Sequence, residues 1–208
     1  MLKWFFIGVL MKNLFVLFLF LPIICMAAPK KILFLGDSLT EGYGVKREKS
    51  YPYLLEQHFN KTQKLIKVIN GGVSGSTTSS GLERLNWHIK RSPEILFLAL
   101  GANDGLRGIS LKVTFQNLEK IIQTALDKKI KVVLAGMLLP LNYGKKYRDD
   151  FEKGYKELAK KFDVIFIPFL LDGVARKKEF NIDDGIHPNE KGHEKIKNNV
   201  IPFLKKLI

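Results

Sequence analysis

Cysteine is almost absent from this chain, which contains one cysteine in 208 residues. A single cysteine excludes an intrachain disulfide framework and any zinc site built from several cysteines. The sequence also lacks internal repeats and low-complexity blocks, which argues against collagen-like, mucin-like and coiled-coil proteins. Hydrophobic residues make up 46% of the chain and aromatic residues 11%, enough for a packed core. The length fits a single domain, and the apolar content excludes a disordered chain despite the net charge of +14.

Acidic residues are scarce, with 20 Asp and Glu against 34 Lys and Arg. A strong positive charge favours anionic partners in general. The lysines are scattered along expected solvated faces, and no basic run is interleaved with aromatic residues; examples are Lys61, Lys64, Lys67, Lys128 and Lys129. We therefore expect no nucleic-acid partner, while the charge remains compatible with transient contact with a membrane surface.

The N-terminus predicts a signal peptide over residues 1–27. The apolar run Leu14–Ile24 follows a lysine at position 12 and precedes small residues at Ala27 and Ala28. This order of charged, apolar and small residues is typical of a secretory signal cleaved after Ala27, and the signal is already complete if translation starts at Met11. The prediction is a periplasmic or secreted protein whose single domain spans residues 28–208.

An uncleaved membrane anchor from Trp4 to Met26 is the alternative for the N-terminus. It would bury Lys12 and Asn13 within the span, which is costly in free energy. Lipidation of Cys25 is rejected because the residue before it, Ile24, is large.

Short apolar runs alternate with amphipathic stretches along the rest of the chain. This order predicts an α/β fold, a flavodoxin-like three-layer α/β/α sandwich with a mainly parallel sheet of about five strands. The expected strands are Lys31–Leu35, Ile66–Ile69, Ile95–Leu100, Lys131–Leu134 and Val164–Ile167. The expected helices are Tyr51–Phe59 with Ser50 as its cap, Leu82–Ile89, Leu111–Leu126, Tyr147–Phe162, and a last helix that opens near Pro188 and stops or kinks at Pro202.

Ser38 follows the first expected strand in the turn Gly36-Asp37-Ser38-Leu39-Thr40. A serine between a strand and a helix start exposes its hydroxyl and leaves its backbone N–H free, which suits a nucleophile and its oxyanion. The turn is not the G-x-S-x-G elbow, because residue 40 is threonine. Taken alone, it is equally compatible with an ordinary turn in which Asp37 or Ser38 caps a helix.

Two further loops follow the next two expected strands. In Asn70–Gly75 the glycines would let backbone amides approach a ligand closely, although a merely flexible loop fits as well. In Gly101–Asp104 the amide of Asn103 can donate a hydrogen bond to an oxyanion without carrying charge, although asparagine is also a common turn residue.

Asp184 lies three residues before His187 in a loop near the C-terminus. The carboxylate can reach the histidine Nδ1, which fixes the tautomer and leaves Nε2 to accept a proton from a serine. Metal ligation by His187 with His193 and Glu194 matches no zinc spacing, so no metal is expected. The other histidines, His58, His88 and His193, are expected on helix surfaces.

The blocks GDSLTEGYG, VSG, GAND and DGIHP occur in this order and together resemble the GDSL, or SGNH, hydrolase family. Further segments, including SGSTTSSGLERL, LPLNYGKKY and KFDVIFIPF, extend the resemblance over nearly the whole of residues 28–208. The resemblance implies a nucleophile, Ser38, with Asp184 and His187 completing a triad. It also implies an oxyanion hole formed by Ser38, Gly75 and Asn103.

The resemblance further implies a mobile substrate loop starting at Ser76 and an acyl-groove edge at Leu139, Pro140 and Asn142. Leu106, with Leu139 and Leu141, would suit an acyl chain. The implied activity is hydrolysis of acyl esters and thioesters, as in the periplasmic thioesterase and lysophospholipase branch of the family. The implied enzyme needs no cofactor, acts on a small-molecule substrate and is expected to be a monomer.

Three alternatives to this activity remain open from the residues. A carbohydrate O-acetylesterase would use the same side chains on a short acyl group. A catalytically idle envelope-binding protein would use the basic surface to recognise an anionic lipid or polymer. A nucleotide-binding flavodoxin-like domain would share the fold, although no phosphate-loop pattern is present.

Overall fold

The computed structural model describes residues 28–62 and 64–208. The predicted signal peptide, residues 1–27, lies outside the described residues, and so does the alternative anchor. Within the part that is described, no helix combines the length and apolar character needed to cross a membrane.

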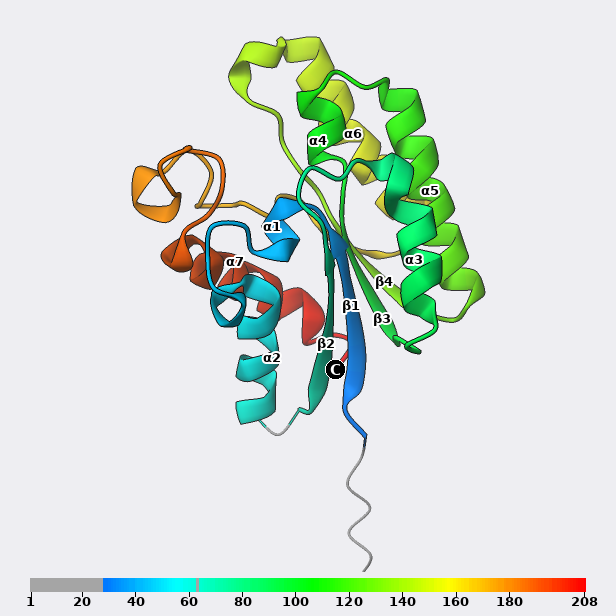
Figure 1. The fold of residues 1–208 in the computed structure, drawn as a ribbon. Helices are drawn as coiled ribbons and strands as arrows, with labels where there is room; N and C mark the ends of the chain where they lie inside the picture. The colour runs from blue at the N-terminus through cyan, green and yellow to red at the C-terminus, as the bar shows by residue number, and fades with distance from the viewer. Residues whose placement is uncertain (1–27, 63) are drawn as a thin grey trace, which may run out of the picture.

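A five-stranded parallel sheet forms the centre of the fold (Figure 1). Its strands are β1 (Lys30–Gly36), β2 (Ile66–Gly72), β3 (Ile95–Ala99), β4 (Lys131–Ala135) and β5 (Ile165–Ile167). They lie in the order β2-β1-β3-β4-β5, and every neighbouring pair is parallel. The predicted strands are therefore confirmed, with ends that shift by one to three residues.

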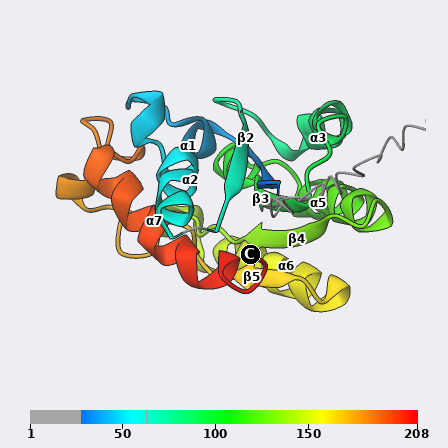
Figure 2. The ribbon, with the colours of Figure 1, turned by 90° about the horizontal axis from the view of Figure 1, so that it is seen from below.

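Helices cover both faces of the sheet and complete the predicted three-layer sandwich. The helices are α1 (Ser38–Glu41), α2 (Tyr51–Lys61), α3 (Gly81–Ile89), α4 (Ala102–Leu106), α5 (Leu111–Asp127), α6 (Lys145–Phe162) and α7 (Glu190–Leu204). The neighbours α2 and α7 lie on one face with α1, whereas α3, α5 and α6 lie side by side on the other (Figures 1 and 2).

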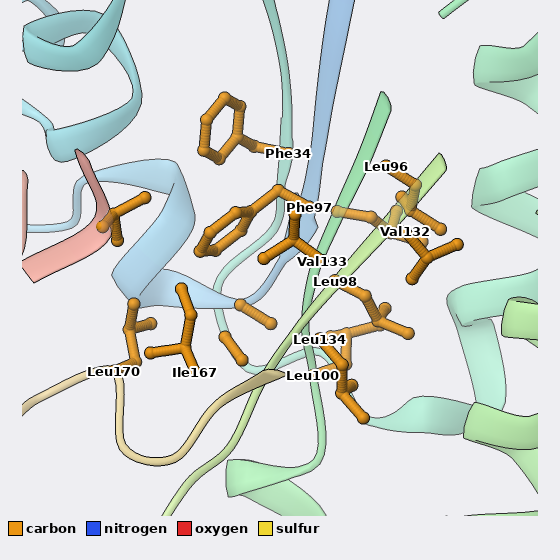
Figure 3. Packing of buried hydrophobic residues seen from close by; sticks show 14 of the residues in the cluster. Phe34, Leu96, Phe97, Leu98, Leu100, Val132, Val133, Leu134, Ile167 and Leu170 are labelled. Carbon is orange, nitrogen blue, oxygen red and sulfur yellow. The ribbon is translucent and has the colours of Figure 1, made fainter. Parts of the chain in front are cut away.

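The central strands are buried on both sides, which explains their unbroken apolar sequences. All five residues of β3 are buried. Phe97 points toward the α2 and α7 layer beside Phe34 of β1, whereas Leu96 and Leu98 point to the opposite side (Figure 3). The rings of Phe34 and Phe97 have centroids 4.9 Å apart. Successive side chains of a strand face opposite sides, so each layer of helices packs on its own set of apolar residues.

Two predicted helix boundaries need correction. Ser50 does precede α2, but its hydroxyl donates a hydrogen bond to the carbonyl of Arg47 at 2.7 Å and does not cap the helix. The last helix passes through Pro202 and ends at Leu204. A proline removes one backbone hydrogen bond, and this loss is small within the last turn, where few helical bonds remain to be made.

The predicted exposure of His193 is wrong. His193 is fully buried on α7, and its Nδ1 accepts a hydrogen bond of 3.2 Å from the backbone N–H of Tyr51. This contact ties the last helix to the start of α2, which sequence spacing does not reveal. His58 and His88 lie on α2 and α3 and are half-buried.

Burial lowers the pKa of His193 from 6.5 to about 4, so the folded protein keeps this side chain neutral at pH 5. The unfolded chain binds a proton there below about pH 6.5. We therefore expect His193 to lower the free energy of unfolding by about 2 kcal/mol between pH 7 and pH 5.

Urea unfolding at both pH values, in the wild type and in His193→Gln, measures this contribution. The difference between the two proteins isolates His193, because the other titrating groups are common to both. An equal pH dependence in wild type and variant would contradict the assignment.

Candidate active site

Three neighbouring strands, β2, β1 and β3, bring three of the predicted site residues to the same edge of the sheet. Ser38 opens α1 directly after β1, Gly75 follows β2, and Asn103 follows β3 within α4. The strand order reverses at β1, where successive connections leave toward opposite faces. In parallel α/β sheets, ligands bind outside the carboxyl ends of the strands at such a point.

Ser38, His187 and Asp184 form a continuous hydrogen-bonded series. The hydroxyl of Ser38 lies 2.9 Å from Nε2 of His187, and Nδ1 of the same ring lies 2.6 Å from Oδ2 of Asp184. Ser38 is separated from the other two by most of the chain, and the fold closes this gap by bringing the loop before α7 over α1. The ring of Tyr43 flanks the imidazole, with centroids 4.6 Å apart.

The loop of Asp184 is built around its carboxylate. Oδ1 accepts hydrogen bonds of 2.9 Å from the backbone N–H groups of Ile186 and His187. Partial burial would raise the pKa of Asp184, but the hydrogen bonds from His187 and Ile186 outweigh it and lower the pKa below its usual value. The carboxylate is thus ionised at neutral pH and holds a proton on the Nδ1 side of the ring.

The turn from β1 into α1 leaves the backbone of Ser38 available. The carboxylate of Asp37 accepts the N–H of Leu39 at 3.1 Å, which makes Asp37 the N-cap of α1, one of the two capping alternatives. Asp37 is buried, and burial raises its pKa to about 6 despite the hydrogen bond from Leu39. At the first position of the helix, the N–H of Ser38 has no intrahelical partner and can serve a ligand.

Gly75 and Asn103 border the same cavity as Ser38. Gly75 has φ +74°, a left-handed conformation that glycine adopts without strain, and its N–H makes no hydrogen bond to any described residue. The amide Nδ2 of Asn103 donates to the carbonyl of Ser76 at 3.0 Å. This bond uses one N–H of the amide and leaves the second N–H without a partner among the described residues.

Two carboxylates that the sequence did not single out hold the loop after β2. Glu41 of α1 accepts the N–H of Ser74 at 2.7 Å and also bonds its hydroxyl. Asp104 is buried and accepts the N–H of Thr78 at 2.9 Å and its hydroxyl at 2.6 Å. The segment that carries Gly75 is therefore fixed at both ends. Glu41 and Asp104 lie within the blocks GDSLTEGYG and GAND, but their partners are 33 and 26 residues away, so the sequence does not reveal what they bind.

Gly72, at the end of β2, is needed for the packing of α1 and not for the approach of a ligand that the sequence suggested. A Cβ on Gly72 would lie 2.1 Å from the backbone nitrogen of Glu41. Glycine at position 72 thus allows α1 to pack directly on β2, and the close approach there is between two backbones.

A cavity of about 560 Å³ opens beside Ser38 and His187, and its walls are mostly apolar. Of the predicted substrate-binding residues, Leu106, Leu139 and Pro140 line it, and Leu141 does too. Ser76 and Asn142 are not among its lining residues. Leu106 and Leu141 are 39% and 60% exposed, so the mouth of the cavity presents apolar surface to solvent.

The structure also contradicts the grouping of His187 with His193 around a metal. His193 is buried, and its Nδ1 is occupied by the N–H of Tyr51. Within residues 28–62 and 64–208, no three His, Cys, Asp or Glu side chains gather in a way that could hold a metal ion.

A hydroxyl linked through an imidazole to a carboxylate is the geometry by which serine hydrolases activate their nucleophile. More narrowly, the chain belongs to the GDSL-like Lipase/Acylhydrolase family, whose sequence profile matches residues 34–195. It is therefore an ester-hydrolysing enzyme.

Similar proteins agree with this membership. An arylesterase of Vibrio mimicus is 43% identical over 162 residues, which cover 77% of this chain and 81% of the relative. Thioesterase 1/protease 1/lysophospholipase L1 of Escherichia coli is 39% identical over 175 residues, 83% of each chain. Among solved structures, TesA superposes with a TM-score of 0.83 at 33% identity, covering 86% of this chain and 100% of TesA. The esterase EstA of Pseudoalteromonas, inhibited by monoethylphosphonate, has a TM-score of 0.81 at 29% identity, covering 86% and 98%.

Proposed function

We propose that this protein hydrolyses acyl esters and thioesters, with Ser38 as nucleophile, His187 as general base and acid, and Asp184 as the group that orients the imidazole. The single observation that supports this most strongly is the hydrogen-bonded series from Ser38 Oγ through His187 to Asp184, at 2.9 and 2.6 Å. Distances in this range allow direct proton transfer between serine and histidine.

The mechanism follows from these contacts. His187 Nε2 takes the proton of Ser38 as the hydroxyl oxygen attacks the acyl carbon, and Asp184 stabilises the imidazolium. The N–H groups of Ser38 and Gly75 and the amide of Asn103 donate to the developing oxyanion. His187 then gives its proton to the leaving alcohol or thiol, and an acyl-enzyme remains. Water attacks this ester, His187 accepts the proton of the water and returns it to Ser38, and the free acid departs.

The substrate class is proposed from the cavity. Its volume of about 560 Å³ lies in the usual range for small-molecule sites, and its walls include Leu106, Met137, Leu139 and Phe169. Exposed apolar side chains at its mouth would gain free energy by covering a hydrocarbon chain. A medium or long acyl group fits this surface better than an acetyl group does. The thioesterase and lysophospholipase activities in the names of relatives are compatible with the same preference.

Hydrolysis of p-nitrophenyl esters from acetyl to dodecanoyl tests both activity and chain length. We expect Ser38-dependent hydrolysis that is faster with medium or long chains than with acetyl. Leu141→Asp should shift the preference toward acetyl, whereas Leu65→Asp, a matched change of an exposed leucine before β2, should not. A peak at acetyl in the wild type would contradict the proposed substrate and favour an O-acetylesterase.

Asn103→Ala is expected to lower kcat by roughly 10²–10³-fold, the usual cost of removing one oxyanion donor. KM should change much less, because the donor acts mainly on the charge that develops in the transition state. Steady-state kinetics with a medium-chain ester gives both constants. Asn86→Ala, an exposed asparagine on α3, is the matched control. A near-wild-type rate in Asn103→Ala would make the oxyanion assignment wrong.

We further propose that residues 1–27 are a signal peptide and that the mature enzyme, residues 28–208, acts in the periplasm or outside the cell. The described residues hold a five-stranded sheet, helices on both of its faces and a continuous hydrophobic core, which supports a mature domain that begins near residue 28. The proposed triad and oxyanion hole lie within one chain. A monomer is therefore sufficient for the proposed chemistry.

A further inference from the structure

We propose that the end of the molecule opposite the active site docks on the surface of an anionic lipid bilayer. This end, called here the amino-end face, comprises the last turns of α2, α3, α5 and α6, the residues that lead into the strands, and the chain after α7. Figure 2 views the molecule from this end. The inference concerns a surface that the proposed chemistry does not use.

Positive charge is concentrated on the amino-end face. Thirteen Lys and Arg side chains stand against three acidic side chains, Glu94, Asp127 and Asp163, and against the carboxyl group of Ile208, whose oxygen lies 3.2 Å from Lys64 Nζ. The cations are Lys30, Lys31, Lys61, Lys64, Lys90, Arg91, Lys128, Lys129, Lys131, Lys160, Lys161, Lys205 and Lys206. They come from separate parts of the sequence, and the parallel fold gathers them because every helix that leads into a strand ends there. Four of them line a cavity of about 480 Å³ at the amino-terminal ends of β1, β3 and β4, namely Lys30, Lys128, Lys129 and Lys131.

Salt bridges are rarer among these cations than elsewhere in the described chain: one of the thirteen is paired, against seven of the other nineteen described Lys and Arg. Of the nine salt bridges between described residues, the only one that involves this face joins Lys161 to Glu119. Lysines at helix C-termini stabilise the helix dipole, which accounts for some of them. It does not account for Lys30, Lys31 and Lys131, which lie on strands. Lys30 and Lys31 donate to the carbonyls of Leu207 and Arg91 at 2.8 and 3.1 Å, and these neutral acceptors leave their positive charge uncompensated. A cluster of unpaired cations is attracted to an anionic membrane by about 1 kcal/mol for each Lys or Arg near the surface.

An exposed tryptophan favours lipid over other polyanions. Trp87, near the end of α3, is 68% exposed, and the ammonium of Lys90 lies 5.3 Å from its ring centroid. Trp is enriched at membrane–water interfaces, where its apolar ring enters the headgroup region and its N–H stays hydrated. Leu65, 39% exposed, adds a second apolar side chain to this face. A surface that only binds a polyanion electrostatically has no need of this apolar contact.

The start of the domain lies on the same face. β1 begins at Lys30, two residues after Ala28, the first residue described (Figure 1). The apolar run Leu14–Ile24 is separated from Lys30 by five residues. Five residues extend over at most about 20 Å. While this run is held in a membrane, as a signal peptide or as an anchor, the amino-end face is necessarily the part of the domain close to the lipid.

Docking in this way directs the active site away from the bilayer. Ser38 follows the carboxyl end of β1, and the seven residues of that strand span roughly 23 Å. The cavity then opens to the aqueous phase. We expect the bound enzyme to hydrolyse water-soluble esters at the rate of the free enzyme. This consequence rests on the proposed function, whereas docking itself does not.

Co-sedimentation of residues 28–208 with lipid vesicles tests the proposal. Vesicles of phosphatidylcholine containing phosphatidylglycerol should bind the protein at low salt and release it at high salt, and phosphatidylcholine alone should not bind it. Replacing Lys90, Lys128, Lys129 and Lys131 together by Gln should weaken binding by on the order of 1,000-fold. Hydrolysis of soluble p-nitrophenyl butyrate should remain unchanged in this variant, which separates docking from catalysis.

The matched control replaces four exposed, unpaired lysines elsewhere, Lys112, Lys178, Lys191 and Lys195, by Gln. It has the same net charge and should keep most of the vesicle binding. Equal loss in the two quadruple variants would overturn the proposal, because net charge and not this face would then be responsible. Absence of any preference for phosphatidylglycerol would overturn it as well.

Trp87 reports on lipid directly, because it is the only tryptophan in residues 28–208. Its fluorescence emission should shift to the blue on phosphatidylglycerol-containing vesicles, and Trp87→Ala should bind them less tightly than the wild type. Unchanged emission on bound vesicles, together with equally tight binding of double-stranded DNA, would identify a general polyanion surface and overturn the lipid assignment.

Discussion

Ser38→Ala is expected to lower kcat for ester hydrolysis by about 10⁵-fold or more, which is the scale on which loss of a serine nucleophile acts. The hydroxyl is the one group in the proposed series that can form the acyl-enzyme, and alanine leaves His187 without a proton to accept. The N–H of residue 38 remains, so weak residual hydrolysis from the oxyanion hole is compatible with the mechanism.

Ester hydrolysis by purified Ser38→Ala, measured at high enzyme concentration, gives the size of this effect. Ser110→Ala is the control, because Ser110 is exposed and its side chain makes no capping bond at the start of α5. A variant with more than about a tenth of the wild-type rate would show that Ser38 is not the nucleophile.

Asp184→Asn is expected to lower kcat by about 10⁴-fold while leaving the fold intact. The asparagine amide would donate to Nδ1 of His187 and place the ring proton on Nε2, where it faces Ser38. The ring could then no longer accept the serine proton. Oδ1 can still accept the N–H groups of Ile186 and His187, so the loop should keep its shape.

Asp183→Asn is the matched control for this change. Asp183 is the adjacent exposed carboxylate, it lies in the same loop, and its side chain makes no hydrogen bond to a described residue. Activity and thermal unfolding are measured for both variants. Equal activities in the two variants would show that Asp184 does not orient His187.

The sheet and the candidate site residues could be predicted from sequence because each depends on a short local pattern, either an apolar run or a polar residue that follows such a run. Strands such as β3 are buried on both faces, and this requirement leaves an unbroken apolar run. The carboxyl ends of parallel strands meet at one edge, so Ser38 and Asn103 could be placed together without knowing the strand order. Their joint occurrence with the Asp184 and His187 pair carries more information than any one of the motifs.

The remaining features depend on distances in space that the order of residues does not contain. His193 has the sequence surroundings of an exposed helical residue, yet α7 packs on α2 and buries it. From sequence alone Glu41 would be assigned to the solvent-exposed surface, and only the structure shows that it accepts a hydrogen bond from Ser74 in the loop after β2. The lysines of the amino-end face look scattered in the sequence, because each helix contributes only one or two of them and the helices are far apart along the chain.

The predicted acyl groove is a further case in which the sequence identifies a segment but not the direction of its side chains. Leu139 and Pro140 line the cavity as expected, but Asn142 follows in the same segment and does not. Residues 141–143 form a short 3-10 turn, which changes the direction of successive side chains. Motif resemblance identified the segment, whereas the turn decides which of its side chains face the cavity.

Covalent labelling with a fluorophosphonate tests the central claim most directly, since this reagent reacts with an activated serine hydroxyl. The related esterase EstA is described as inhibited by a phosphonate, which makes the chemistry suitable. We predict one label per chain, located by peptide mass spectrometry on Ser38, with no labelling of Ser38→Ala and greatly slowed labelling of His187→Ala. A folded wild-type protein that takes up no label, or that takes it up on another residue, would contradict the account.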